Sequence, residues 1–336
     1  MTAPPANLQE LDGWLAERGL SRPADPPAAQ SGACLWKWDD YYPGLLKAGE
    51  LVPVGPQGLT EMRTVGFKNP LSPTMPRTIS LGPQILMPGE RTRAHSNIKN
   101  ESRLVVKASP GAVFIMDDES FPMEEGDLVI CPTWATHDHY NGGAEPAIWM
   151  DGLDMGLQGL GVEINERYPV DDPYQKTAKP AGYSQRVRGH VKPTWLESKA
   201  PRPPLSYRWA DTQDALNALR ESEAEGDPYD GLRLTFASPV DGGATLSTIC
   251  WYVQLLTGRQ TTQDHRHNST ALYYAFRGQG TTIVDGERLE WTQGDIFVVP
   301  PWTLHHHENR TSQDAILYSM DDSPAIQKMG FYKEEP

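Results

Sequence analysis

The sequence predicts an all-β protein of two tandem barrels or sandwiches with a few peripheral helices. Its 336 residues correspond to about two domains at roughly 150 residues each. Its 30 prolines disfavour a mainly helical protein, because proline interrupts helices and collects at turns and strand ends. The 13 tyrosines and 10 tryptophans, set among short runs of Val, Ile and Leu, favour strands.

An internal repeat turns the estimate of two domains into a specific prediction. The window GDLVICPTWATHDHYN at 126–141 matches GDIFVVPPWTLHHHEN at 294–309 with a constant offset of 168. Upstream, QILMPGERTRAHSN at 84–97 matches QLLTGRQTTQDHRH at 254–267 with an offset of 170. Both windows recur in the same order about half a chain apart, so the sequence predicts a duplicated domain.

The first segment of the chain, residues 1–60, is expected to form a helical or irregular arm. Its apolar stripe at helical spacing consists of Leu8, Leu11, Trp14, Leu15 and Leu20. Residues 61–160 are expected to form the N-terminal barrel, with 127–131 as a short buried strand.

The second half follows a proline-rich connector, predicted at residues 161–228. A helix in this connector is expected to begin at an Asp211 cap and to end near Gly226. Residues 229–336 are expected to form the C-terminal barrel, in which the run 284–291 is typical of a β-hairpin with an Asp285-Gly286 turn.

Charge and composition exclude several classes of function. The 44 acidic and 30 basic residues leave a net charge of −14, which disfavours nucleic acid and anionic membranes as partners. No run approaches the ~20 apolar residues that span a bilayer, and the start lacks the pattern of a signal peptide. Three distant cysteines fit a reducing compartment, so the predicted location is the cytoplasm.

The histidines gather in the repeated windows, which hold eight of the nine. His265 and His267 are two residues apart, so in a strand they project to one face, where His305 from another strand can complete a triangle. Three neutral imidazoles suit Fe, Zn, Cu or Ni and leave coordination positions open. The alternative interpretation is a polar, aromatic core without metal.

Two motifs in these windows resemble those of the cupin superfamily. The second motif is present twice, as Gly294, Pro300, His305 and Asn309 and as Gly126, Pro132, His137 and Asn141. The first motif, His-x-His followed by Glu, is present as His265-Arg266-His267 with Ala271 in place of the Glu. This combination resembles the three-histidine bicupin dioxygenases that cleave gentisate, salicylate or 1-hydroxy-2-naphthoate. The resemblance extends to residues 36–52, 151–157, 229–243 and 330–335.

The resemblance implies a fold, a cofactor and a reaction. The fold would be two tandem cupin barrels, which are double-stranded β-helices of the jelly-roll type. Fe(II) would be the cofactor, and a salicylate-type ring would be cleaved by O2 between its carboxyl-bearing and hydroxyl-bearing carbons. Gentisate, salicylate, a 5-substituted salicylate and 1-hydroxy-2-naphthoate all remain open as the small aromatic acid. A homo-oligomer, commonly a tetramer in this family, is also implied.

The two halves differ in their candidate metal ligands. In these dioxygenases the working iron is generally associated with the N-terminal cupin, but here Asn97 replaces the second histidine. Glu101 stands where the other half has Ala271, so His95, Glu101 and His137, with Asn97 beside them, form an alternative site. The intact set His265, His267 and His305 is the favoured metal site.

Substrate contacts are expected on the strands that carry these ligands. Arg103 matches the family's arginine that pairs with substrate carboxylate, although an internal salt bridge to Glu101 is an equal alternative. Its C-terminal counterpart is Tyr273, so strand parity makes Tyr273, Gln254, Arg288 and His307 the candidates for binding substrate there. His307 or His139 is expected to move the phenolic proton, because imidazole titrates near neutrality.

Two other functional classes remain as alternatives. A cupin isomerase or hydrolase with Zn, Mn or Ni would keep the metal without the oxygen chemistry, and the identity of the metal would distinguish it. A non-catalytic bicupin that binds a ligand is the second alternative. The complete triad argues against this alternative, because binding alone does not require a metal with open positions.

Overall fold

The computed structural model describes residues 32–54, 63–69, 78–155, 171–188, 193–195, 205–222 and 226–336, together with isolated positions elsewhere. Residues 31–336 form one unit that holds both barrels, and residues 1–30 form another. The apolar stripe of the expected N-terminal helix lies outside the described residues.

The N-terminal barrel is built from two antiparallel sheets. The larger sheet has the order β2-β8-β3-β6-β9, and the smaller has the order β5-β4-β7. Their strands are β2 (Ile79–Leu86), β3 (Glu101–Lys107), β4 (Ala112–Met116), β5 (Glu119–Pro122), β6 (Leu128–Cys131), β7 (His137–Asn141), β8 (Ala147–Asp154) and β9 (Leu205–Tyr207). Strands β6 and β7 come from the first copy of the repeated window and lie in different sheets.

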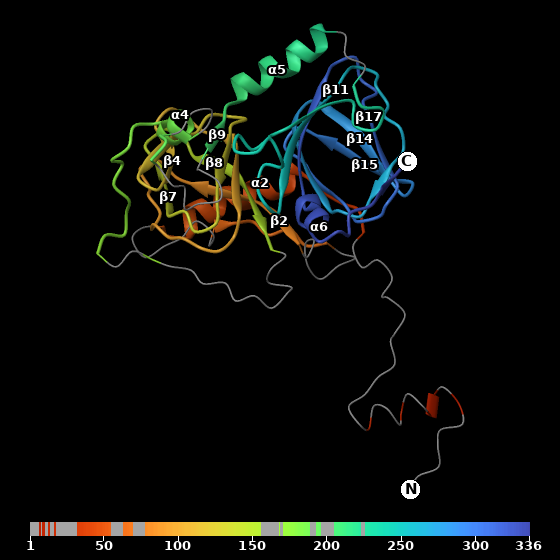
Figure 1. Ribbon diagram of the computed structural model, residues 1–336, viewed down its shortest axis with the longest axis horizontal. Coiled ribbons are helices and arrows are strands. Elements are labelled where there is room, and N and C mark those ends of the chain that lie inside the picture. The colour runs from red at the N-terminus through yellow and green to blue at the C-terminus, as the bar shows by residue number, and fades with distance from the viewer. Residues whose placement is uncertain are drawn as a thin grey trace. The chain divides into compact units, whose positions relative to one another are not determined.

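The C-terminal barrel repeats this arrangement (Figure 1). Its sheets have the orders β1-β16-β13-β18-β11-β10 and β15-β14-β17, and a third, two-stranded sheet pairs β12 with β19. The strands are β1 (Cys34–Trp36), β10 (Leu232–Thr235), β11 (Cys250–Leu256), β12 (Arg266–His267), β13 (Ala271–Arg277), β14 (Gln279–Val284), β15 (Glu287–Thr292), β16 (Ile296–Val299), β17 (His305–Glu308), β18 (Ala315–Asp321) and β19 (Glu334–Glu335). The predicted duplicated all-β fold and the Asp285-Gly286 hairpin are confirmed.

Each half of the chain contributes a strand to the other barrel, and the helix that follows it packs against a strand of its own half. Strand β1 of the first half pairs with β16 of the C-terminal barrel, and β9 of the second half pairs with β6 of the N-terminal barrel. Helix α2 (Trp38–Leu51) follows β1, and helix α5 (Trp209–Glu221) follows β9. The two barrels are therefore joined by the exchange of β1 and β9, in addition to the connector between them.

The repeated Gly-Asp pairs explain how the segments that follow β1 and β9 dock. Trp38 donates its backbone N–H to Asp295 Oδ1, and Trp209 donates its backbone N–H to Asp127 Oδ1, each at 2.8 Å. The preceding glycines, Gly294 and Gly126, have positive φ, and a Cβ on either would lie 2.8 Å from a tryptophan ring atom. Each glycine thus adopts the positive φ that the turn requires, and its lack of a side chain leaves room for the tryptophan of the other half.

The start of helix α5 differs from the prediction. Asp211 was expected as its N-cap, but the helix begins at Trp209 and ends at Glu221, before Gly226. The prediction was wrong because the capping carboxylate is distant in sequence. It belongs to Asp127 in the N-terminal barrel, which accepts the backbone N–H of Trp209. Two further short helices are α4 (Tyr183–Arg188) and α6 (Ser323–Lys328).

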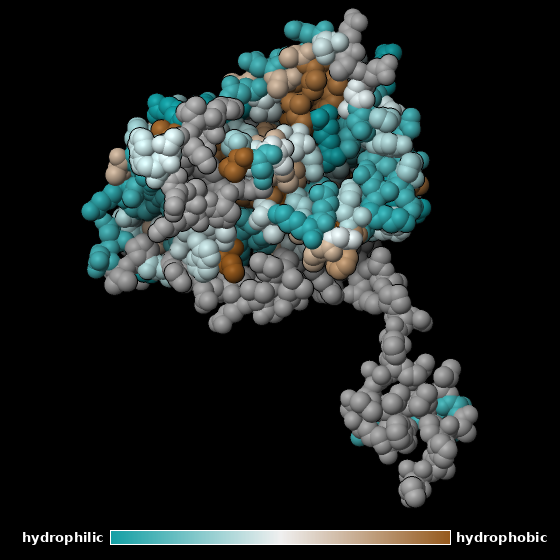
Figure 2. All heavy atoms as spheres, in the orientation of Figure 1, coloured by the Kyte–Doolittle hydropathy of each residue, from teal (hydrophilic) through white to brown (hydrophobic). Residues whose placement is uncertain are grey.

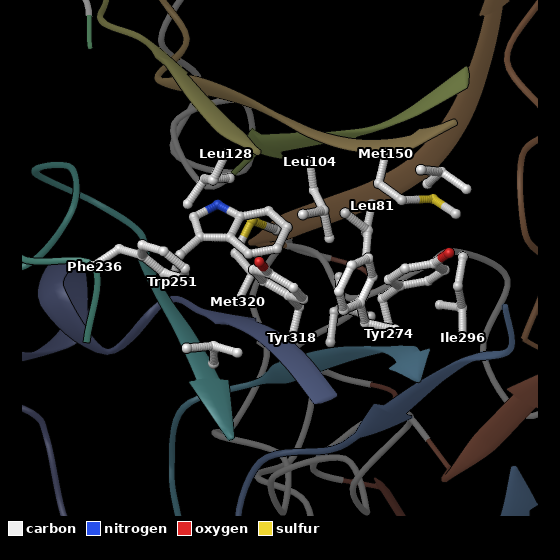
Figure 3. Close-up of a cluster of buried hydrophobic side chains, with 14 of the residues drawn as sticks. Leu81, Leu104, Leu128, Met150, Phe236, Trp251, Tyr274, Ile296, Tyr318 and Met320 are labelled. Atoms are coloured by element: carbon white, nitrogen blue, oxygen red, sulfur yellow. The ribbon is translucent and has the colours of Figure 1, made fainter. Parts of the chain in front are cut away.

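A shared core holds the barrels together. Leu81, Leu104, Leu128 and Met150 of the N-terminal barrel face Trp251, Tyr274, Ile296 and Met320 of the C-terminal barrel (Figure 3). Trp251 donates its indole N–H across this interface to Ser102 Oγ at 2.8 Å. The hydrophobic faces of the two large sheets therefore cover each other, while each barrel keeps a separate interior cluster.

Polar contacts at the barrel interface repeat in both halves. The carboxylate of Asp154 accepts the hydroxyl of Thr248, and that of Asp322 accepts the hydroxyl of Thr78. The face in Figure 2 is largely hydrophilic over its described residues, with scattered apolar side chains. Over the described parts of the chain, no helix has both the length and the apolar character needed to cross a membrane.

Candidate active site

The C-terminal barrel brings the three predicted histidines together. His265 and His305 exchange two backbone hydrogen bonds, at 3.0 and 2.8 Å, as an isolated antiparallel bridge. His267 lies on β12, which pairs with β19, and its carbonyl accepts the N–H of Trp302 at 2.7 Å. Alternation along the strand then places His265 and His267 on one side, as the His-x-His spacing predicted.

The three imidazoles face one point. Their candidate ligand nitrogens all lie within 4.8 Å of one another, and His265 Nε2 is 2.8 Å from His305 Nε2. The Nδ1 atoms of His267 and His305 lie 3.0 Å from the carbonyls of Ser269 and Thr303. Because a carbonyl only accepts, each Nδ1 carries the proton and each Nε2 keeps its lone pair.

Burial keeps these imidazoles neutral. It lowers the pKa of His265 and of His267, and in His305 burial and the two neighbouring imidazoles lower the pKa well below its usual range. Three neutral nitrogen donors, two of them with a backbone carbonyl behind the ring, are a set that fits Fe, Zn, Cu or Ni. The residues present therefore fit a transition metal.

Three of the other predicted residues line the interior beside this triad. His307 is fully buried, burial lowers its pKa to about 3, and its Nδ1 lies 2.9 Å from Thr282 Oγ1. The ring centre of Tyr273 is 5.2 Å from that of His307. Gln254 is buried on β11 and donates from Nε2 to the Asp230 carbonyl at 2.6 Å.

Arg288 lies elsewhere. On β15, Leu289 and Trp291 fill the barrel interior, so Arg288 projects from the opposite face. There it lies 3.7 Å from Glu290 and 3.5 Å from Glu308, with a side chain that is 41% exposed. The structure does not bring Arg288 to the triad, and its predicted role in binding substrate gains no support from this position.

A buried ion pair beside the triad was not predicted. Arg233 on β10 is the cross-strand partner of Gln254, and its Nη1 donates to Asp230 Oδ2 at 2.5 Å. Burial and then the Arg233 charge set the pKa of Asp230, and the net effect lowers it to about 2. A single arginine in a short strand has no motif, so only its position on a strand next to Gln254 could have indicated it.

The N-terminal barrel also gathers its four candidate ligands, but in a different way. The ring centres of His95 and His137 are 4.3 Å apart, and His137 Nε2 is 3.2 Å from Glu101 Oε2. Asn97 donates to Glu101 Oε1 at 2.7 Å. Cys131 places Sγ 3.3 Å from His137 Nδ1 and, with Glu101 and His137, forms a second group whose possible ligand atoms lie within 4.8 Å of one another.

Arg103 pairs with two carboxylates in this N-terminal cluster. It donates to Glu101 Oε2 at 2.8 Å and forms a salt bridge with Asp151. Burial opposes the ionisation of Glu101, but Arg103 and His137 outweigh it and hold the pKa of Glu101 well below its usual range. The predicted internal salt bridge is confirmed, and the guanidinium is already neutralised by protein groups.

His139, the equivalent of His307, is enclosed. It stacks on Trp149 with ring centres 4.5 Å apart, and Arg103 Nε donates to its Nε2 at 3.4 Å. Burial, reinforced by the charge of Arg103, lowers the pKa of His139 well below its usual range. Both histidines are thus neutral, but the Nε2 atom of His139 is already a hydrogen-bond acceptor.

The comparisons with known proteins agree with this geometry. Residues 84–153 and 251–321 each match the cupin domain family. The chain is 34% identical over 330 residues to 1-hydroxy-2-naphthoate 1,2-dioxygenase of Nocardioides sp. (strain KP7), covering 96% of this chain and 84% of the relative. It is 33% identical over 306 residues to 5-aminosalicylate 1,2-dioxygenase of Comamonas sp., covering 90% and 80%.

A solved structure confirms the fold over almost the whole chain. Salicylate 1,2-dioxygenase from Pseudoaminobacter salicylatoxidans, in its adduct with gentisate, superposes with a TM-score of 0.86 at 24% identity, covering 99% of this chain and 95% of that one. Both barrels and the order of their strands are therefore common to the two proteins. With relatives matched over most of their length, the chain belongs to the bicupin family of ring-cleaving dioxygenases.

Proposed function

We propose that this protein is an Fe(II)-dependent dioxygenase whose working site lies in the C-terminal barrel. Its substrate is a small salicylate-type acid, and gentisate, salicylate, a 5-substituted salicylate such as 5-aminosalicylate, and 1-hydroxy-2-naphthoate are the candidates. The ring is cleaved by O2 between the carboxyl-bearing and hydroxyl-bearing carbons. The observation that carries the proposal is the convergence of the neutral His265, His267 and His305 imidazoles within 4.8 Å.

The chain's own residues divide the work at this site. His265, His267 and His305 would hold Fe(II), which supplies Lewis acidity and electron transfer for the reaction of the ring with O2. His307 is the group proposed to move the phenolic proton, because its Nε2 is an open acceptor in the interior and its Nδ1 contacts Thr282. Burial lowers its pKa to about 3, so the role rests on this position and not on titration near neutrality. Gln254 and Tyr273 line the same interior and are proposed to orient the ring.

In the N-terminal barrel Glu101, Cys131 and His137 converge to the same extent, but protein hydrogen bonds occupy the carboxylate, so we propose a structural role for this cluster. Both oxygens of Glu101 accept hydrogen bonds, Oε1 from Asn97 and Oε2 from Arg103. A metal bound there would have to displace the guanidinium of Arg103 from a fully buried carboxylate, at a cost of several kcal/mol. We therefore assign no metal to His95, Asn97, Glu101 and His137, and no substrate contact to Arg103 and His139.

A pair of variants tests the choice of barrel. After anaerobic purification, His267→Ala is expected to lose bound iron and O2 consumption with the candidate acids. His95→Ala should keep both, because it removes a residue of the structural cluster. Loss of turnover in His95→Ala with retention in His267→Ala would reverse the assignment. Wild-type protein that contains no iron and consumes no O2 with any of the acids would contradict the dioxygenase itself.

The remaining expectations concern assembly and location. A homo-oligomer is proposed from the family alone, and sedimentation of the purified protein tests it. The cytoplasm is the proposed location because Cys34, Cys131 and Cys250 are all free thiols, which suits a reducing compartment.

A further inference from the structure

The interior of the C-terminal barrel contains buried polar atoms that no described residue satisfies. These atoms are Gln254 Oε1, Ser319 Oγ, His307 Nε2 and Arg233 Nε. An unsatisfied buried polar group costs about 1–3 kcal/mol, so native proteins rarely leave several together. Such a group of atoms indicates a place where a polar ligand or water is bound.

Strand register shows that these atoms share one interior. Gln254 on β11 lies opposite Arg233 on β10, and Ser319 on β18 lies opposite Tyr273 on β13. Directly opposed residues of antiparallel strands project to the same face. Tyr273 belongs to the interior hydrophobic cluster of this barrel, and its ring contacts that of His307. The orphaned atoms therefore face the same barrel interior as His307 and Tyr273.

Arg233 places a guanidinium cation in this interior, and not all of its N–H donors have a hydrogen-bond partner. Among the described residues its only hydrogen bond runs from Nη1 to Asp230, and its guanidinium packs 3.8 Å from the ring centre of Tyr252. The edge formed by Nε and Nη2 can take a carboxylate through two parallel hydrogen bonds.

The two barrels treat their buried arginines differently. The side chain of Arg103 is 1% exposed and lies between Glu101 and Asp151. That of Arg233 is 22% exposed and, among the described residues, forms a salt bridge with Asp230 alone, while the charge of Asp321 acts on it at longer range. A substrate carboxylate can therefore reach Arg233 without displacing a protein carboxylate. At the position equivalent to Arg103 the C-terminal barrel has Tyr273, which supplies no charge.

We infer that Arg233 binds the carboxylate of the aromatic acid through its Nε–Nη2 edge and is the residue that selects charged acids over neutral phenols. This inference rests on the proposed function, because it places the substrate in the C-terminal barrel. Asp230 holds the guanidinium in position through Nη1. Gln254 lies across the strand pair from Arg233, so its orphaned Oε1 can accept the ring hydroxyl of the same ligand.

Binding of salicylate and of its neutral amide, salicylamide, tests this role without turnover. Titration calorimetry of the iron-loaded protein under anaerobic conditions measures both ligands. The variant Arg233→Ala with Asp230→Asn removes the pair without leaving a buried charge. It is expected to bind salicylate roughly 10- to 100-fold more weakly, with little change for salicylamide. Arg233→Lys should be intermediate, because lysine keeps the charge and loses the planar fork.

Two controls make the result specific. Asp230→Asn alone keeps Arg233 and leaves an amide oxygen that can accept from its Nη1, so it should lose less affinity for salicylate than the double variant does. Arg310→Ala removes an exposed arginine of the same barrel, paired with Glu308, and should change neither affinity. An equal loss of affinity for both ligands in the double variant, or no loss for either, would overturn the inference.

The outcome also separates this inference from the proposed function. If salicylate binding depends on Arg233 but the protein consumes no O2, the proposed function fails and the anion site stands. If ring cleavage proceeds and selectivity for salicylate over salicylamide does not depend on Arg233, the inference fails and the proposed function stands. For the dioxygenase, Arg233→Ala with Asp230→Asn should raise KM for the acid more than it lowers kcat.

Discussion

The two barrels place opposite chemistry at equivalent positions. Where the C-terminal barrel has His267, Ala271 and Tyr273, the N-terminal barrel has Asn97, Glu101 and Arg103. The first group keeps three neutral imidazoles available. The second forms a network in which a carboxylate, an amide and a guanidinium satisfy one another at 2.7 to 2.8 Å.

This difference shows that the partners of a buried group decide whether it can act on a ligand. Arg103 and Arg233 are both arginines inside a barrel, but Arg103 contacts two carboxylates and Arg233 contacts one. His139 and His307 occupy equivalent positions, yet His139 Nε2 accepts from Arg103 whereas His307 Nε2 has no partner among the described residues. The arginine of one barrel is therefore held by two protein carboxylates and that of the other by one, while unsatisfied buried atoms occur in both barrels, among them the equivalent Gln84 Oε1 and Gln254 Oε1.

The largest expected effect comes from breaking the N-terminal network. Arg103→Ala leaves Glu101 and Asp151 buried without a counter-charge, so we expect the free energy of unfolding to fall by about 3–5 kcal/mol. Iron content should be unchanged, and urea denaturation with metal analysis measures both. The matched variant Tyr273→Phe in the other barrel should cost less than about 1.5 kcal/mol. A folded Arg103→Ala protein that has lost its iron would contradict the comparison.

The free energy of unfolding is expected to depend on pH through Asp322, one of the two carboxylates at the barrel interface. Burial raises the pKa of Asp322 to about 6, although Thr78 and Thr270 oppose the shift with hydrogen bonds. The folded state then binds more protons than the unfolded state between about pH 4 and pH 6. The free energy of unfolding is therefore highest below this window and falls as the pH rises through it, by up to roughly 3 kcal/mol.

Asp322→Asn should remove this pH dependence, because asparagine imitates the protonated carboxyl. Urea denaturation at a series of pH values measures the slope. The matched variant is Asp154→Asn at the other half of the interface, where burial also raises the pKa. If Asp322→Asn leaves the slope between pH 4 and pH 6 unchanged, the interface carboxylate is not its source.

Metal removal should affect only one barrel. A ligand held at 100 times its dissociation constant stabilises the folded state by about 2.7 kcal/mol, so stripping iron with a chelator should lower the unfolding temperature of the wild type. The chelator should have no such effect on His267→Ala, whereas His95→Ala should respond as the wild type does. Differential scanning calorimetry makes the comparison. A wild type whose unfolding temperature does not change with the chelator would contradict the assignment of the metal.

The sequence was sufficient for the duplicated fold and for the grouping of the three histidines, because both depend on short-range patterns. The repeated Gly-Asp and Pro-x4-His windows indicate two copies of one domain, and the His-x-His spacing places two imidazoles on one face of any strand. The Glu101–Arg103 pair could be proposed for the same reason. Parity along β13 also placed Tyr273 in the interior.

Only the tertiary structure decided the rest. The exchange of β1 and β9 between barrels, and the capping of α5 by Asp127, join residues that are 75 or more positions apart, and no local pattern encodes such contacts. Arg288 and Arg233 are both arginines in short strands, but the register of their sheets turns Arg288 outward and Arg233 toward Gln254. The availability of a buried cation depends on how many carboxylates the fold places around it, and that is a property of packing.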